Sequence, residues 1–179
     1  MEHNNKKDKK SKLLILLLLL ITVIAVSVTI WAVFIRDNTP TVLTPDYAPV
    51  ETEEHAEEIP NDTDEQMESS EGGGAVSLTY TDEVSIDLSE KQASLLFGNP
   101  GKSNQDAVIQ IIIQDEIIVQ SGTLKPGHQV TTLDLLDGAD KLLSEGTYKG
   151  KLNILYYNQE SGEKAILNTE IPVDITVTQ

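Results

Sequence analysis

A cluster of aspartates is the part of this sequence whose residue types best suit metal chemistry. Asp134, Asp137 and Asp140 stand around Gly138, as acids do in calcium-binding loops. They lack the alternating spacing of an EF-hand, and two leucines follow Asp134 where further ligands would stand. The cluster is therefore interpreted as a capped helical turn, and calcium binding near the three aspartates stays open as the alternative.

Two histidines and one loop have residue types that could serve other chemistry. His55 lies in an acidic run without a second His or Cys at ligand spacing, and His128 follows Pro126 and Gly127 alone, so both are predicted to be surface residues. The loop Asn99–Ser103 has neither the spacing nor the following helix of a phosphate-binding loop. No catalytic triad, carboxylate pair or metal triad is recognisable. The sequence therefore predicts a protein that is not an enzyme, with no catalytic residue, cofactor or metal.

Composition and charge narrow the classes of partner. The chain has no cysteine, which excludes a disulfide framework and zinc-thiolate sites. The formal net charge is −16, and residues 37–75 carry twelve Asp and Glu with no Lys or Arg. Such a segment repels the phosphate backbone, so we expect no nucleic-acid partner.

An uncharged run over residues 13–35 predicts a membrane anchor. As a helix it would reach roughly 35 Å, enough for a hydrocarbon core of about 30 Å. Five lysines precede it and acids follow Arg36, so the positive-inside rule puts the N-terminus in the cytoplasm. The prediction is a basic cytoplasmic tail at 1–12 and a transmembrane signal-anchor helix at 13–35 of a single-pass plasma-membrane protein. The alternative is a signal peptide cleaved near Ala25 and Ser27, which would release a secreted binding protein.

The next stretch, residues 36–75, has four prolines, a run of glutamates and three consecutive glycines. It offers too little apolar area to offset the entropy of ordering. The sequence therefore predicts a disordered acidic stalk, which would hold the following domain away from the membrane.

Residues 76–179 alternate between apolar and polar side chains, as strands with one buried face do. About seven strands in one domain favour an antiparallel sandwich of two sheets. Gln114–Glu116 is predicted to be a hairpin turn, residues 135–143 to form a helical turn, and Pro172 to lie at an edge or bulge. The predicted strands cover residues 84–88, 93–97, 109–113, 117–119, 130–132, 148–157 and 171–177.

The segment Leu143–Tyr148 resembles the tyrosine corner of immunoglobulin-like (Ig-like) and fibronectin-like domains. Leu124–Gly127 ahead of a strand is also similar to Ig-like domains of bacterial surface proteins. The Cys pair and buried Trp of antibody domains are absent, since the only Trp is Trp31. The resemblance implies an Ig-like β-sandwich over 76–179, with Gly146 and Tyr148 as structural residues and the Tyr148 hydroxyl bonded to backbone a few residues upstream.

These features together predict a bacterial cell-surface protein whose Ig-like module contacts an extracellular protein or polymer, in adhesion, the envelope or surface assembly. The alternative is a ligand-sensing or carbohydrate-binding ectodomain, which needs an exposed aromatic platform. Of the tyrosines in the module, Tyr157 is the one predicted to point to solvent.

Overall fold

The computed structural model describes residues 15–24, 26, 44–69 and 73–179. The chain divides into two units, Met1–Thr41 and Val42–Gln179. In the first unit, residues 15–24 and 26 are helical. No helix among the described residues is long and apolar enough to cross a membrane. The predicted basic tail and the rest of the predicted span at 13–35 lie outside the described residues.

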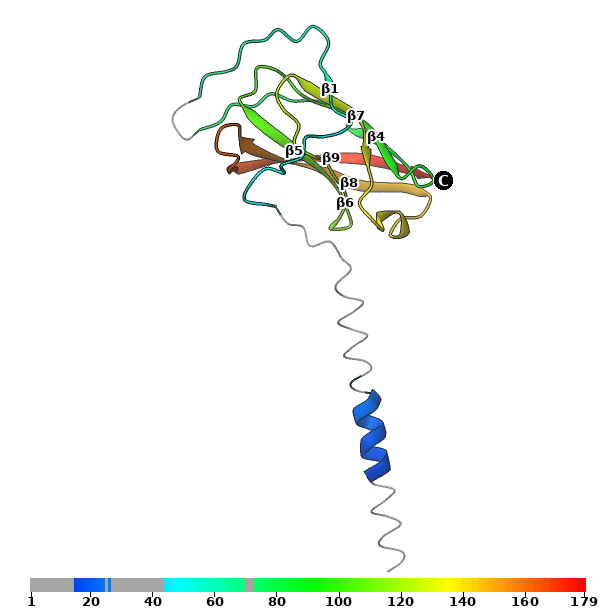
Figure 1. The fold of residues 1–179 in the computed structure, drawn as a ribbon. Helices are drawn as coiled ribbons and strands as arrows, with labels where there is room; N and C mark the ends of the chain where they lie inside the picture. Colours follow the sequence, from blue (N-terminus) through cyan, green and yellow to red (C-terminus); the bar gives the residue numbers. More distant parts are fainter. Residues whose placement is uncertain (1–14, 25, 27–43, 70–72) are drawn as a thin grey trace, which may run out of the picture. The chain divides into compact units, whose positions relative to one another are not determined.

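The second unit is built from strands, which confirms the all-β class (Figure 1). The seven predicted strands correspond to β3 through β9, and the predicted helical turn contains one 3-10 helix. Two short strands, β1 and β2, were not predicted. The elements are β1 Glu57–Glu58, β2 Thr79–Tyr80, β3 Glu83–Asp87, β4 Gln92–Asn99, β5 Gln105–Ile113, β6 Glu116–Gln120, β7 His128–Asp134, η1 Ala139–Lys141, β8 Gly146–Asn158 and β9 Lys164–Thr178.

The strands form one curled sheet instead of two separate sheets. Its order is β1-β7-β4-β3-β9-β8-β5-β6, and β2 pairs with β4. The central strand β3 joins the halves, because it pairs with β4 on one side and with β9 on the other. The β3–β9 pairing is parallel, from Glu83 opposite Asp174 to Asp87 opposite Thr178, whereas the other strand pairs are antiparallel.

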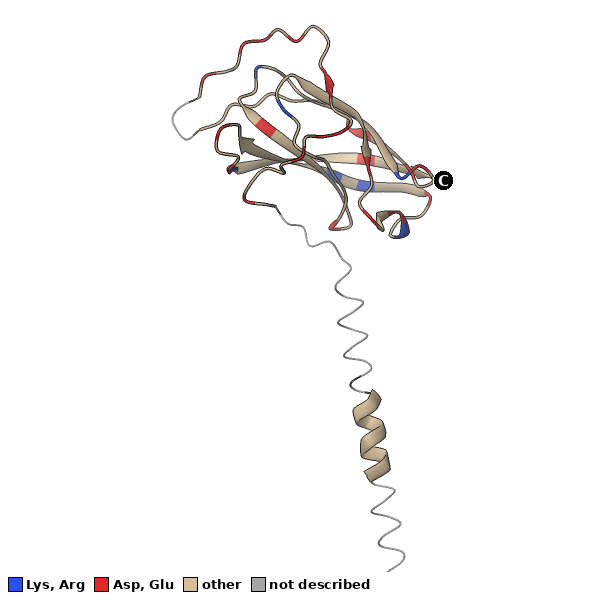
Figure 2. Ribbon diagram, in the orientation of Figure 1, with Lys and Arg blue, Asp and Glu red and all other residues tan. Residues whose placement is uncertain are grey.

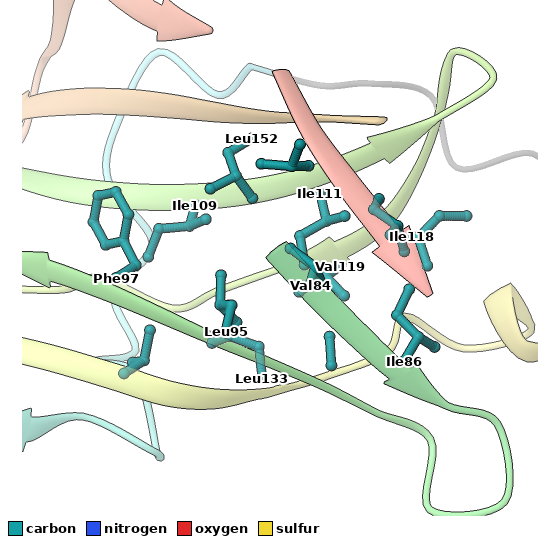
Figure 3. Packing of buried hydrophobic residues seen from close by; sticks show 14 of the residues in the cluster. Val84, Ile86, Leu95, Phe97, Ile109, Ile111, Ile118, Val119, Leu133 and Leu152 are labelled. Carbon is teal, nitrogen blue, oxygen red and sulfur yellow. The ribbon is translucent and has the colours of Figure 1, made fainter. Parts of the chain in front are cut away.

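The core lies inside the curl. Alternate residues of the strands point into it, so the period-two pattern of the sequence becomes one buried face. Figure 3 shows side chains from both halves of the sheet meeting there. The largest buried members include Phe97, Ile109, Leu133 and Leu152, none more than 1% exposed. Because both halves contribute to it, neither half has a core of its own.

A second, smaller cluster covers the outer face of β5 and β8. It consists of Val108, Leu155 and Tyr157, with Ala48 packed against them. The prediction that Tyr157 points to solvent is wrong, since its side chain is 0% exposed. Alternation does place Tyr157 on the outer face, but the segment around Ala48 covers that face.

The covering segment belongs to the stretch predicted to be a disordered stalk, and there the prediction is wrong. Residues 44–69, called here the docked segment, hydrogen-bond to the sheet and its loops, while 36–43 and 70–72 lie outside the described residues. Tyr47 pairs with Glu163, Thr52 pairs with Thr123, and β1 pairs with β7. The prediction of disorder judged the segment by the apolar area that it can bury. The segment is instead attached in part by backbone hydrogen bonds, which composition does not indicate. The folded unit therefore begins well before residue 76.

At Gly122, in the connection from β6 to β7, the backbone of the docked segment approaches closely. A Cβ there would lie 2.8 Å from the backbone nitrogen of Glu53 and 2.9 Å from the carbonyl carbon of Thr52. We expect Gly122→Val to displace this part of the segment and to lower the free energy of unfolding by about 1–3 kcal/mol. Urea unfolding and amide hydrogen exchange of residues 51–53 measure the two effects.

The control for this substitution is Thr131→Val, at an exposed position of β7. It also introduces a valine and should change stability by less than about 0.5 kcal/mol. Unchanged exchange at residues 51–53 in the Gly122 variant would mean that the close approach is absent in solution.

Two local predictions are confirmed. Gln114 and Asp115 have φ of 51° and 66° and connect β5 to β6 as a hairpin. Pro172 lies on the part of β9 that pairs with β8 alone, because the β3 pairing begins only at Asp174. Its missing N–H therefore disrupts no ladder.

Candidate interaction surface

Gly146 and Tyr148 lie at the start of β8, after the connection from β7. The Tyr148 hydroxyl donates to the Ser144 carbonyl oxygen at 2.9 Å and accepts the Ser144 N–H at 3.2 Å. The half-buried ring packs against the core. Gly146 has φ of 146°, which a residue with a side chain rarely adopts. The arrangement contains the upstream backbone bond that a tyrosine corner requires.

The Tyr148 hydroxyl bond can be tested by removing one atom. Tyr148→Phe keeps the packing and deletes the hydroxyl, so we expect a loss of about 0.5–1.5 kcal/mol in urea unfolding. The loss should stay in this range because Ser144 is exposed and water can replace the bond. An unchanged midpoint would show that the hydroxyl contributes nothing.

The structure does not bring the three candidate calcium-ligating aspartates together. Asp134 accepts a bond from Gln92 and lies 3.1 Å from the His55 ring, while Asp140 lies 3.5 Å from the Lys91 ammonium. Among the described residues no group of three His, Cys, Asp or Glu is placed to hold a metal ion. The observed geometry thus favours the helical turn.

His55 and Asp134 form an ion pair between the docked segment and β7. The hydrogen bond to Asp134 raises the pKa of His55, against the opposing effect of burial, and Glu53 and Glu54 add to the rise. The same bond lowers the pKa of Asp134, helped by Gln92. His128, predicted to be a surface residue, is half-buried in β7 with its Nδ1 3.1 Å from the Pro126 carbonyl oxygen.

The His55–Asp134 pair makes the attachment of the docked segment depend on pH. A raised His55 pKa means that its contribution is present below the ordinary value of 6.5 and is lost as the pH rises through the raised one. A lowered Asp134 pKa means that its contribution is present above 3.8 and is lost as the pH falls through the lowered one. The pair is therefore strongest between these two values.

We expect His55→Gln to speed hydrogen exchange at residues 53–56 at about pH 5.5 and to have little effect at about pH 8.5. The contribution should not exceed about 1 kcal/mol, because solvent screens both groups. An equal effect at the two pH values would contradict the ion pair.

Asn99 attaches the loop Asn99–Ser103 to neighbouring parts of the domain. Its buried side-chain amide donates to the carbonyl oxygens of Gln105 and Leu124, at 3.0 and 3.1 Å. The Gly101 N–H donates to Asp62 of the docked segment at 2.6 Å. These contacts give the loop a structural role.

A ladder of side-chain amides crosses the outer face of four strands. Gln110 donates to Gln120 at 2.8 Å, Asn153 donates to Gln110 at 2.8 Å, and Asn168 donates to Asn153 at 2.9 Å. Gln110 and Asn153 are buried, at 0% and 4% exposed. The alternation of the sequence puts Gln110 on the face opposite Ile109 and Ile111. Nothing in the alternation indicates that this face is also covered.

The exposed apolar surface of the described module includes an irregular part of β9. Between the pairs Leu155–Asn168 and Tyr157–Lys164, β9 advances four residues while β8 advances two. The extra residues form a bulge, and bulges redirect side chains. Ile166 is 100% exposed and Leu167 is 76% exposed. Two adjacent aliphatic side chains are thus presented to solvent near the β8–β9 turn.

Beside this bulge one edge of β9 is unpaired. The N–H of Asp174 donates to Asp82, and that of Lys164 donates to Asp46, both away from β8. Since N–H groups alternate along a strand, those of Asn168 and Glu170 point the same way. No described residue pairs with this side of β9 between 165 and 173. We call this stretch the open edge.

The docked segment and the module together carry far more acidic than basic residues. Residues 44–179 contain seven Lys, no Arg and 26 Asp and Glu. Figure 2 shows the acids distributed over the docked segment, the loops and several strands. Lys149 and Lys151 of β8 pair with Asp174 and Glu170 of β9. Most of the acidic side chains are thus left without a lysine beside them, and this negative surface favours a cationic partner.

No protein-family model matches the sequence, and no curated protein matches it. Among solved structures, the chain is similar to AggA, the major subunit of aggregative adherence fimbriae type I from Escherichia coli. The similarity has 12% sequence identity and a TM-score of 0.29, over 59% of this chain and 96% of that chain. A TM-score this low carries no information about function.

Proposed function

We propose that this chain is a single-pass bacterial surface protein, without enzymatic activity, whose Ig-like module makes a protein contact outside the membrane. The observation that carries the contact is the exposed pair Ile166 and Leu167 on the β9 bulge. A partner that covers these two adjacent aliphatic side chains would remove their apolar area from water, and exposed apolar patches mark such contact sites.

The Ig-like assignment is supported by strand order. One half of the curled sheet runs β7-β4-β3 and the other β9-β8-β5-β6, with the Tyr148 bond at the start of β8. An Ig-type domain likewise has its tyrosine at the start of the strand that follows the crossing between sheets.

The anchor is supported by the sequence. The uncharged run at 13–35 is long enough to span a bilayer, and the lysines before it favour a cytoplasmic N-terminus. The module would then face the outside. External protease on intact cells should digest the module and leave an N-terminal fragment in the membrane, whereas a protected module would contradict this topology.

The contact is tested with a photo-crosslinking amino acid in the full chain on native cells. Placed at Ile166, it should give a discrete covalent adduct with another protein. The control position is Thr176, which is also exposed on β9 but lies outside the bulge. Adducts at neither position, or equal adducts at both, would overturn the assignment of this surface.

A further inference from the structure

We infer that the open edge of β9 accepts an extended, basic peptide segment of a partner protein as an added strand. This inference rests on the proposed function and specifies how the contact is made. It combines three features of one region: unpaired backbone groups, an exposed aliphatic pair and flanking acids.

The backbone supplies the first feature. The N–H groups of Asn168 and Glu170 and the carbonyl groups beside them have no partner among the described residues, and the other side of β9 is paired with β8 from Asn168 onward. An added strand satisfies such groups by extending the ladder. Pro172 limits the addition, because it has no N–H to offer at the next position on this side.

The docked segment already uses the start of the same edge. Tyr47 pairs antiparallel with Glu163, the Ala48 N–H donates to the Gly162 carbonyl oxygen, and Lys164 donates to Asp46. This side of β9 is therefore accessible to an extended chain. The bulge follows directly, so a strand added beyond Lys164 would lie beside Ile166 and Leu167.

The acidic residues around the open edge favour a basic peptide. Asp46 and Glu163 stand at one end of the open edge, and Asp82 and Glu83 stand where β3 joins β9 at the other. At that second end a shallow hollow of about 460 Å³ is lined by Glu83 and Asp174, among others. Lys149 pairs with Asp174, and Lys164 stands at the other end, so the acids at the two ends still outnumber these cations. A strand with basic residues at its ends is therefore favoured over an acidic one, and over a second copy of this strongly acidic module.

The probe is a synthetic nine-residue peptide of alternating threonine and valine with a lysine at each end. It is added to the full chain in detergent micelles, and amide hydrogen exchange is followed residue by residue. We expect exchange at Asn168 and Glu170 to slow by about tenfold or more at saturation, because these two N–H groups become hydrogen-bonded. Amides of β3 and β8 should not change.

Two substitutions of one residue separate backbone pairing from charge. Glu170→Pro removes the N–H that points to the open edge and leaves the β8 ladder intact, as Pro172 does, so it should abolish protection with an unchanged unfolding midpoint. Glu170→Gln removes the same carboxylate but keeps the N–H, so it should still bind. A peptide with glutamate in place of both lysines should bind at least about tenfold more weakly.

Several results would overturn the inference. If the acidic peptide binds as tightly as the basic one, the claim that the open edge prefers a basic segment is wrong. If the amides of Asn168 and Glu170 are protected from exchange without any peptide, a segment of this chain already occupies the edge. Protection that increases with protein concentration would show that this segment belongs to a second copy. If no peptide protects the edge while crosslinking at Ile166 still succeeds, strand addition is wrong and the proposed contact stands.

Discussion

Replacing Tyr157 by alanine is expected to lower the free energy of unfolding by about 3–5 kcal/mol. The ring is fully buried with Val108 and Leu155, and its hydroxyl donates to the Pro45 carbonyl oxygen at 3.2 Å. Burial, with Asp46 nearby, raises the pKa of Tyr157 to about 12. The substitution would open a cavity under the docked segment and release one of its attachments. Urea unfolding and hydrogen exchange at residues 45–48 report the two losses.

The matched control is Tyr80→Ala. Tyr80 lies on β2 with 47% of its surface exposed, so its loss should cost less than about 0.5 kcal/mol. The two variants delete the same atoms from the same residue type. Equal small losses would mean that the docked segment does not cover Tyr157 in solution.

Replacing Gln110 by leucine is expected to cost about 2–4 kcal/mol, although the new side chain is more apolar. The substitution removes the acceptor of the buried Asn153 amide and the donor to Gln120. A buried polar group left without a partner loses its hydration and gains nothing in return. The free energy of unfolding from urea melts measures the loss.

A double-mutant cycle identifies the cause of the Gln110 effect. When Asn153→Leu is added, the unsatisfied amide disappears, so the double variant should lose less than the sum of the single losses. The expected coupling is about 0.5–3 kcal/mol. Strict additivity would show that the two side chains do not interact.

The sequence predicted the strands because their signal is local. Val84 and Ile86, or Ile109 and Ile111, alternate with polar residues, and this alternation places each side chain on a face. Alternation does not say what covers the outer face. Tyr157 was therefore assigned to solvent, although a segment about 110 residues earlier in the chain covers it, as its bond to Pro45 shows.

The docked segment and the open edge were beyond the reach of sequence reasoning for a related physical reason. An acidic, proline-bearing composition predicts disorder when stability is judged by apolar area, but backbone pairing such as Tyr47 with Glu163 contributes without apolar side chains. The open edge follows from which strands are neighbours, and that is a property of the whole sheet. Ile166 and Leu167 lay outside the predicted strand at 171–177, and their exposure depends on a register shift that the sequence does not reveal.

The position of β9 constrains when the molecule can fold. It follows the other described strands in the sequence, yet it lies between β3 and β8, and its pairing with β3 joins the halves of the sheet. A growing chain therefore cannot close its core until β9 has left the ribosome. Pairings this distant in sequence form slowly, and meanwhile the isoleucine-rich β5 stays uncovered and prone to aggregate. The chain therefore remains open until β9 is available to pair with β3 and β8.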